Sequence, residues 1–161
     1  DGSNRFYGAN ANDSSGLGDW LQGDGGKDYF TPLLGNDIVI GGEGRDKVEY
    51  KRGVQHGVDR VEIRLDDGAY AHIAALDGIN YDVIGKAISY DSNGNVLGTD
   101  TLVDIERAKG TYGDDALYGS SFDNAFDPGA GDDIIDGGSN WFSSWLSPGS
   151  SYNGVIYDGE Y

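Results

Sequence analysis

A nine-residue period in two stretches of the chain constrains its fold more than any other feature. When residues 14–49 and 110–136 are written in rows of nine, the sixth residue of every row is Asp or Asn and the eighth is apolar. The sixth positions are Asp19, Asp28, Asp37, Asp46, Asp115, Asn124 and Asp133. The eighth positions are Leu21, Phe30, Val39, Val48, Leu117, Phe126 and Ile135. A flexible linker does not keep its apolar residues in phase with its acids, so both blocks predict a repetitive fold.

The spacing of the apolar residues predicts very short strands. One apolar residue per nine indicates a strand of about three residues that points one side chain inward. The Gly-rich remainder of each row then forms a turn, because Gly adopts positive φ and lets backbones approach closely. If two rows form one coil of a parallel β-roll, rows n and n+2 stack. Asp19 then lies beside Asp37 at one edge, and Asp28 beside Asp46 at the other.

Composition indicates that such a fold needs a cation. The 161 residues include 28 Gly, and 28 Asp and Glu against 11 Lys and Arg, which gives a formal net charge of −17. Charge of this size repels itself in a compact state. A Ca²⁺ ion takes about 6–8 oxygen ligands, and the carboxylates and carbonyls of two stacked turns can supply them.

Two motifs resemble those of a known family. Residues 41–49, GGEGRDKVE, match the calcium-binding repeat GGxGxDxUx at every fixed position, and residues 99–119, TDTLVDIERAKGTYGDDALYG, look like the usual entry into a repeat block. The chain therefore resembles RTX, or hemolysin-type calcium-binding, proteins over about residues 14–138. The resemblance implies an all-β fold of calcium-stabilised parallel β-roll segments. It also implies secretion or surface display by a Gram-negative bacterium. The metal ligands that it implies are Asp19, Gly26, Asp28, Gly35, Asp37, Gly42, Gly44, Asp46, Gly113, Asp115, Asn124, Gly131 and Asp133.

Departures from the repeat limit the number of calcium sites. Leu17 occupies the fourth position of the first row, Asn124 replaces Asp, and Phe142 stands where a further Asp would partner Asn124. We therefore expect two well-formed sites in the first block, one between Asp115 and Asp133, and an irregular one beside Asn124. This amounts to about three to four Ca²⁺ ions.

The chain is expected to form a single domain, 1–161, with four parts: repeats at 14–49, a β-strand insert at 50–109, repeats at 110–138, and an aromatic tail at 139–161. In the insert, Val61, Ile63 and Leu65 alternate with charged residues, which predicts a strand with one buried face. Residues 87–98 predict a hairpin with its bend at 91–94. We expect the insert to extend the sheet sideways from the roll. No stretch of the insert shows a convincing helical period, so we expect at most a short helical turn at 70–76 or 104–109.

Two further features admit two interpretations each. Six of the 11 basic residues fall between Arg45 and Arg64. They form either an anion-binding face or a solvated strand whose charges pair with nearby Asp, and the second is the more ordinary. In the tail, Trp141 and Phe142 favour a hydrophobic cap over the last repeat. Trp145 and Tyr152 suit a cap and a ligand-binding surface equally.

Several functions are excluded or disfavoured. The chain has no Cys, and its two His residues are too far apart for an HExxH zinc site. The excess of acids disfavours nucleic acid and anionic lipid as partners. No apolar run approaches the ~20 residues of a membrane span, so we expect no membrane insertion. We expect no enzymatic activity, because acids held by a cation are poor proton donors and no catalytic motif stands out.

The layout of the repeats suggests the function. Two short blocks with an aromatic tail resemble the ligand-binding modules of large RTX adhesins, some of which bind peptide carboxyl ends with the help of calcium, and others glycans. We therefore expect a monomeric segment of a larger chain, which binds a peptide end or a glycan on a host or neighbouring cell, the peptide being preferred. The ligand-binding residues expected are Arg52, Arg60, Trp145 and Tyr152. The alternatives are a structural calcium-rigidified spacer or secretion β-roll, and a polysaccharide-binding module of a secreted enzyme.

Overall fold

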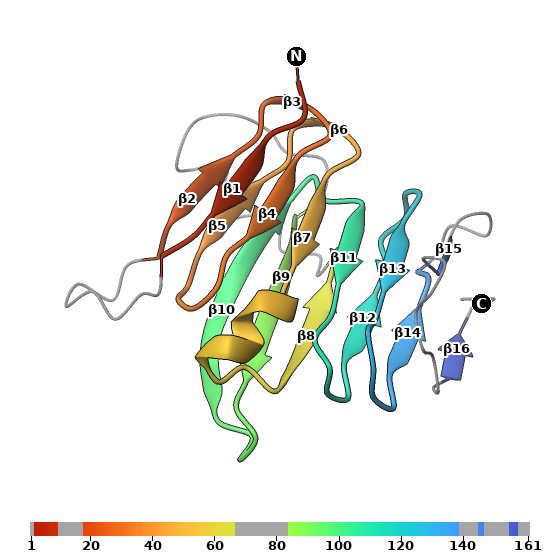
Figure 1. The fold of residues 1–161 in the computed structure, drawn as a ribbon. Coiled ribbons are helices and arrows are strands. Elements are labelled where there is room, and N and C mark those ends of the chain that lie inside the picture. Colours follow the sequence, from red (N-terminus) through yellow and green to blue (C-terminus); the bar gives the residue numbers. More distant parts are fainter. Residues whose placement is uncertain (1, 10–17, 67–83, 139–144, 147–154, 158–161) are drawn as a thin grey trace.

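The fold of the protein is all-β and consists mainly of two sheets that face each other (Figure 1). The structure is a computed structural model, and it describes residues 2–9, 18–66 and 84–138 together with the backbone of 145–146 and 155–157. The six-stranded sheet contains, in order, β1 (Arg5–Tyr7), β4 (Tyr29–Thr31), β7 (Lys47–Glu49), β11 (Arg107–Lys109), β13 (Ala125–Asp127) and β15 (Trp145–Leu146). The eight-stranded sheet contains, in order, β16 (Val155–Tyr157), β14 (Ile134–Asp136), β12 (Ala116–Tyr118), β8 (Arg60–Arg64), β9 (Ile84–Tyr90), β10 (Val96–Val103), β5 (Ile38–Ile40) and β2 (Trp20–Gln22).

The repeats wind between the two sheets as the period predicts. Within each block, successive strands alternate between the sheets, so that residues two rows apart pair in parallel. Leu21 pairs with Val39, Phe30 with Val48, and Leu117 with Ile135. At one edge, β3 (Gly25–Gly26) and β6 (Glu43–Gly44) form a further short parallel pair. The stacking of rows n and n+2 is therefore confirmed.

The core lies between the sheets and is built from the eighth positions of the repeats. All seven of these apolar side chains are buried, and they pack against Val61, Ile63 and Leu65 of the insert. Phe6 extends the stack at one end, where its ring lies 5.0 Å from that of Phe30. The residues on either side of each eighth position face away from this core, and one of them, Ile40, forms a second, smaller buried cluster with Ile84 and Val103.

The insert differs from the expectation in its position. Its strand at 60–64 and its hairpin, whose bend has Gly94 at φ 82°, are confirmed. These strands do not extend the sheet sideways, because β10 pairs with β5 and β8 pairs with β12. The meander β8–β9–β10 instead occupies the middle of the eight-stranded sheet, whereas β7 pairs directly with β11 in the other sheet. The insert thus replaces one strand of the coil with three.

The only helix in the described part of the chain is the 3₁₀ helix η1 (Lys51–His56), which sequence reasoning missed. It follows β7 and ends at Gly57, whose φ of 94° is left-handed. The expected helical turn at 104–109 is wrong, because 107–109 form β11; the turn at 70–76 falls outside the described residues. No helix among the described residues is long and apolar enough to cross a membrane.

Candidate metal centre

The Asp residues at the sixth positions form two ladders along the edges of the coil. At one edge, the Asp28 N–H donates a 2.7 Å hydrogen bond to Asp46 Oδ1, and the Asn4 N–H donates one of the same length to Asp28 Oδ1. At the other edge, the Asp19 N–H donates to Asp37 Oδ1 at 2.7 Å. One oxygen of each accepting carboxylate therefore holds the neighbouring coil in register, and the other remains for a different partner.

Four loops that precede these strands share one backbone conformation. In loops 23–28, 32–37, 41–46 and 128–133, the second and fourth residues have positive φ. They are Asp24, Gly26, Leu33, Gly35, Gly42, Gly44, Gly129 and Gly131. At Gly44 a side chain would also collide with the next coil, because a Cβ there would lie 1.7 Å from the Gly26 carbonyl oxygen. The repeat therefore needs Gly for conformation and for close stacking.

The same four loops leave a carboxylate oxygen without a partner. Among the described residues, the buried side-chain oxygens with no hydrogen bond are Oδ2 of Asp28, Asp37, Asp46 and Asp133. Each of these side chains is at most 1% exposed. A buried charge without a partner is costly, so these oxygens require either a proton or a cation.

Backbone carbonyls share the space into which two of these oxygens point. A Cβ built on Gly23 would lie 2.5 Å from Asp28 Oδ2 and 2.7 Å from the carbonyl oxygen of Gly41, one coil along. A Cβ built on Gly41 would similarly meet Asp46 Oδ2 at 2.7 Å and the Asp104 carbonyl oxygen at 2.1 Å. At each position a carboxylate and a carbonyl from different coils thus face one small space that only Gly leaves open.

Burial increases the proton affinity of three of these carboxylates. It raises the pKa of Asp37 to about 6 and also raises the pKa of Asp46 and Asp133. The donated backbone hydrogen bonds oppose this effect but do not outweigh it. A cation at the same oxygens would favour the ionised form instead.

In loops 110–115 and 119–124 the second residue, Thr111 or Ser120, donates hydrogen bonds to the side chain at the sixth position. The Thr111 N–H donates to Asp115 Oδ2 at 2.6 Å, and the Val61 N–H donates to Oδ1 at 2.7 Å. The Thr111 hydroxyl group lies 2.8 Å from the Asp59 carbonyl oxygen and 3.0 Å from Asp115 Oδ1, and it can donate to either. In the next loop, Ser120 bonds the amide of Asn124 in the same way. Neither loop has a left-handed residue at its second or fourth position. Asp115 and Asn124, both expected as metal ligands, therefore have their side-chain oxygens hydrogen-bonded by the protein.

Two acids outside the predicted set complete the ladders. The Asp37 N–H donates to Asp100 Oδ1 at 2.9 Å, and the Asp46 N–H donates to Glu106 Oε2 at 2.7 Å. Burial raises the pKa of both acids to about 7. A signal for Glu106 was present, since residues 101–109 continue the second block backwards with Glu106 sixth and Ala108 eighth. Asp100 lies in the hairpin, which has no nine-residue period.

The donor set fits a hard cation that accepts backbone oxygens. In the part of the chain that the structure describes, no three His, Cys, Asp or Glu side chains converge on one point. Carbonyl oxygens and water must therefore supply most of the coordination shell. Ca²⁺ accepts such ligands, whereas zinc prefers nitrogen and sulfur.

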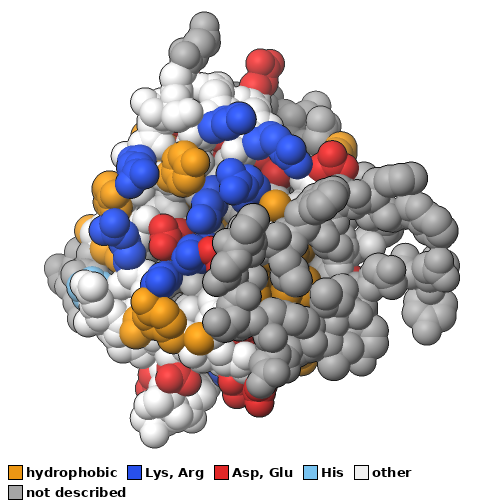
Figure 2. Space-filling view, turned by 45° about the vertical axis from the view of Figure 1, so that its right-hand side comes forward, with side chains coloured by type: hydrophobic (Ala, Val, Ile, Leu, Met, Phe, Trp, Pro, Cys, Tyr) orange, Lys and Arg blue, Asp and Glu red, His pale blue; other side chains and the backbone are white. Residues whose placement is uncertain are grey.

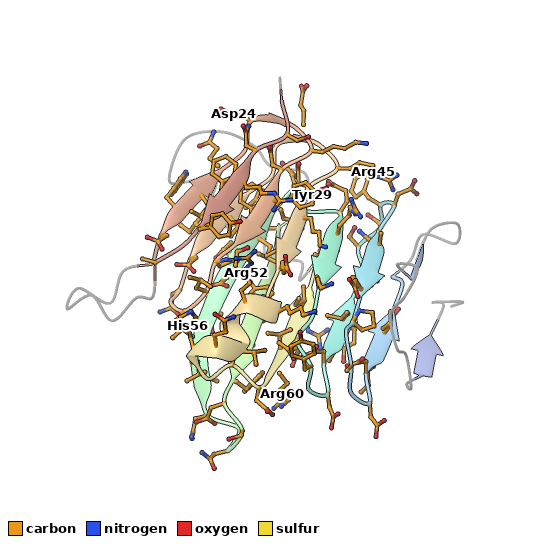
Figure 3. All side chains as sticks on the ribbon, in the orientation of Figure 1. Asp24, Tyr29, Arg45, Arg52, His56 and Arg60 are labelled. Atoms are coloured by element: carbon orange, nitrogen blue, oxygen red, sulfur yellow. The ribbon has the colours of Figure 1, made fainter. Side chains whose placement is uncertain are left out.

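The expected ligand-binding residues do not gather in one place. Arg52 lies beside the six-stranded sheet, and Arg60 begins β8 of the other sheet, where its guanidinium lies 3.9 Å from the centre of the Tyr90 ring (Figure 3). The backbone of Trp145 belongs to β15, and its side chain and the whole of Tyr152 lie outside the described residues.

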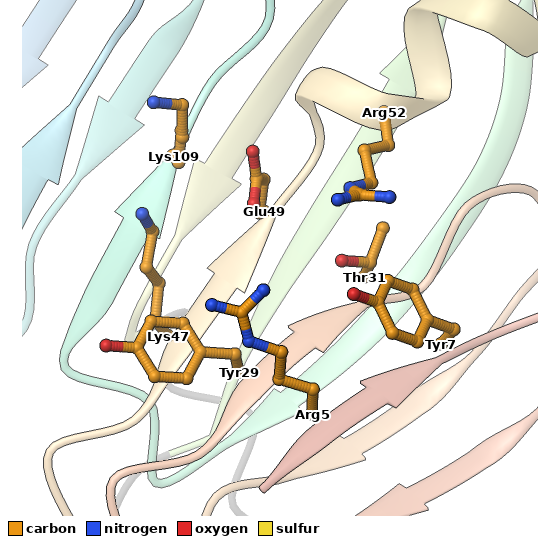
Figure 4. Close-up of a pocket in the computed structure, with 8 residues that line it drawn as sticks. All are labelled: Arg5, Tyr7, Tyr29, Thr31, Lys47, Glu49, Arg52 and Lys109. Carbon is orange, nitrogen blue, oxygen red and sulfur yellow. The ribbon is translucent and has the colours of Figure 1, made fainter. Parts of the chain in front are cut away.

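Arg52 instead lines a shallow pocket on the outer face of the six-stranded sheet, which we call the basic pocket (Figure 4). The volume of this pocket is about 220 Å³. Its lining residues are Arg5, Tyr7, Tyr29, Thr31, Lys47, Glu49, Arg52 and Lys109. Sequence reasoning missed most of them, because they come from four strands and a helix that are distant in sequence.

Neither a family model nor a curated protein matches this chain.

Proposed function

We propose that this chain is a calcium-stabilised β-roll module of an RTX-type adhesin and that it binds a ligand at a cell surface. The observation that carries the calcium assignment is the set of four buried Asp Oδ2 atoms without partners, each in a loop of the same conformation. Asp28, Asp37, Asp46 and Asp133 would hold the ions, together with carbonyl oxygens of the stacked loops. Asp19, whose N–H already bonds Asp37, would contribute at the first row.

Bound calcium would supply positive charge and links between successive coils. In its absence, the chain brings into a compact fold a net charge of −17 and, among the described residues, four buried carboxylate oxygens without a partner. Binding of about three to four ions would offset roughly six to eight of these charges, so the free energy of binding would become free energy of folding. Extracellular calcium modules bind at about 10⁻⁴–10⁻³ M, far above cytosolic concentrations. The chain would then stay loose inside a Gram-negative cell and fold after export.

The basic pocket supports ligand binding over a purely structural role. A spacer has no need of a pocket that collects Arg5, Lys47 and Arg52 in a chain with so few basic residues. We propose that the pocket recognises a peptide end or a glycan without chemical conversion.

The proposal is tested by screening peptide and glycan arrays in millimolar Ca²⁺, and again with chelator. A ligand that binds only with calcium supports the proposal. A protein that folds with calcium but binds nothing on either array favours the spacer.

A further inference from the structure

A concentration of positive charge on the outer face of the six-stranded sheet contrasts with the acidic character of the whole chain. Figure 2 shows Lys and Arg side chains gathered on one face with few carboxylates among them. Four of the 11 basic residues line the basic pocket, and Glu49 is the single acid among its lining residues. The chain as a whole carries a net charge of −17, so an excess of basic residues over the whole surface does not explain this cluster.

The strand register builds the pocket from two rows of outward side chains. Phe6, Phe30 and Val48 point into the core, so the residues on either side of them point outward. The first row runs through Arg5, Tyr29, Lys47 and Arg107, which pair along the sheet. The second contains Tyr7 beside Thr31, and Glu49 beside Lys109. In the repeat block these are the seventh and ninth positions of the rows, which the repeat leaves variable.

Three of the four cations in the basic pocket form no ion pair within the described residues. Lys109 forms an ion pair with Asp127. Arg5, Lys47 and Arg52 form none there, although the two guanidinium groups lie over the rings of Tyr29 and Tyr7, at 5.4 and 5.3 Å from the ring centres. Burial lowers the pKa of Lys47, and the charge of nearby Glu49 only partly opposes this shift. The pocket thus presents positive charge held in place by aromatic rings.

The cations of the pocket favour a ligand with a negative charge, and its other lining residues favour a ligand that also carries hydroxyl groups. Glu49 lies among the four cations (Figure 4) and accepts hydrogen bonds only. Tyr7, Tyr29 and Thr31 add hydroxyl groups, which donate and accept. A ligand with one carboxylate and several hydroxyl groups satisfies both sets, whereas a phosphate dianion would face Glu49 with acceptors alone.

A peptide fits this pocket less well. Its described lining includes no aliphatic side chain that could receive an apolar residue next to a peptide terminus. Strands β4, β7 and β11 lie inside the sheet, and their backbone groups are paired on both sides. A peptide therefore cannot pair with these three strands as an extra strand, which is a common mode of peptide recognition; of the strands that line the pocket, only β1 lies at the sheet edge.

We propose that the basic pocket binds the carboxylate-bearing sugar of an acidic glycan. Arg5 and Arg52 receive the carboxylate, for which the planar guanidinium is suited, with Lys47 adding charge. Glu49 and the hydroxyl groups of Tyr7, Tyr29 and Thr31 bind the sugar hydroxyls. This proposal specifies the ligand class of the proposed function, and it rests on that function because the protein must be folded to form the pocket. The lining residues of the pocket lie outside the proposed calcium loops.

The experiment is titration calorimetry of the calcium-loaded protein with a trigalacturonate, with neutral trigalactose and a peptide with a free carboxyl end as comparison ligands. Of the three ligands, we expect only trigalacturonate to bind. Its affinity should fall as the NaCl concentration increases, because salt screens exposed charges. Arg5→Gln and Arg52→Gln should each weaken it roughly tenfold to hundredfold, the range for one charged hydrogen bond. The matched control is Arg64→Gln, on the other sheet and paired with Glu62, which should bind as the unmodified protein does.

The outcomes separate this proposal from the calcium proposal. Melting curves in Ca²⁺ first establish that each variant is folded. Absence of trigalacturonate binding by the folded protein, tighter binding of the peptide, or full affinity in both pocket variants overturns the pocket assignment and leaves the calcium assignment intact. Pocket-dependent binding by a protein whose melting ignores chelator supports the pocket and contradicts the calcium proposal.

Discussion

The backbone N–H of Asp28 donates a hydrogen bond of 2.7 Å to Oδ1 of Asp46, the residue eighteen positions later, while Oδ2 of Asp46 remains buried without a partner. One oxygen of this carboxylate thus fixes the register of two coils, and the other is the one for which we propose a cation. At Asp115, in the equivalent position, the N–H groups of Val61 and Thr111 bond both carboxylate oxygens. The predictions below depend on this difference between loops.

The first prediction concerns calcium stoichiometry. Asp46→Ala removes a carboxylate with a free buried oxygen, so titration calorimetry should show fewer bound Ca²⁺ ions than in the unmodified protein. Asp115→Asn changes a carboxylate whose oxygens are already hydrogen-bonded, so it should leave the stoichiometry unchanged. An equal loss of calcium in both variants would show that the hydroxyl-bonded loop also binds an ion.

The second prediction concerns Thr111 itself. Thr111→Ala removes a buried hydroxyl group that lies 2.8 Å from the Asp59 carbonyl oxygen and 3.0 Å from Asp115 Oδ1, which should lower the free energy of unfolding by about 1–3 kcal/mol. Urea denaturation in saturating calcium measures this change. The control Thr99→Ala, at an exposed position, should change stability by less than about 0.5 kcal/mol. Similar values for the two variants would contradict the role assigned to Thr111.

The third prediction compares two glycines of one loop. A Cβ at Gly23 would lie 2.5 Å from Asp28 Oδ2, whereas a Cβ at Gly25 would find its nearest neighbour at 3.8 Å. Gly23→Ala should therefore destabilise the calcium-loaded protein by about 1–3 kcal/mol and weaken calcium binding, whereas Gly25→Ala should do neither. Calcium titrations followed by circular dichroism distinguish the variants. Tolerance of Ala at position 23 would mean that the space beside Asp28 is not needed.

The fourth prediction concerns pH in the presence of chelator. The folded-state pKa values of Asp37, about 6, and Asp100, about 7, lie above the ordinary value near 4. The folded protein therefore binds protons more tightly than the unfolded chain, so this stability is present below about pH 4 and is lost as the pH rises through about 6–7. Thermal melts without calcium should show a higher midpoint at pH 5 than at pH 7.5. Asp100→Asn should reduce the difference, and a higher midpoint at pH 7.5 would contradict the prediction.

Sequence patterns predicted local features of this fold better than distant ones. The period identified the inward residues and the stacked Asp pairs, because a strand alternates its side chains and two rows make one coil. It did not reveal that β8–β10 lie between the two blocks in one sheet. The pairing of β5 with β10 and of β8 with β12 joins strands that are distant in sequence, and a local pattern does not encode such pairs. The helix η1 was missed because KRGVQH carries no helical period.

The candidate site divides in the same way. The Asp residues were found because they recur every nine residues, but the distinction between Asp46 and Asp115 depends on the loop conformation, in which the Thr111 N–H bonds the second Asp115 oxygen. The basic pocket was hidden because Arg5, Lys47 and Lys109 are far apart in sequence and meet only through strand pairing. Arg52 and Arg60 are close in sequence, yet β7 and β8 belong to different sheets and separate them.

The measurement that tests the central claim most directly is a thermal unfolding curve of the unmodified protein at pH 7.5, in millimolar Ca²⁺ and then in excess chelator, with Mg²⁺ as the control ion. If calcium satisfies the four buried carboxylate oxygens, chelator should abolish the cooperative transition or lower its midpoint by tens of degrees, and Mg²⁺ should not restore it, because it demands a tighter octahedral shell. A transition that is unchanged by chelator would contradict the account.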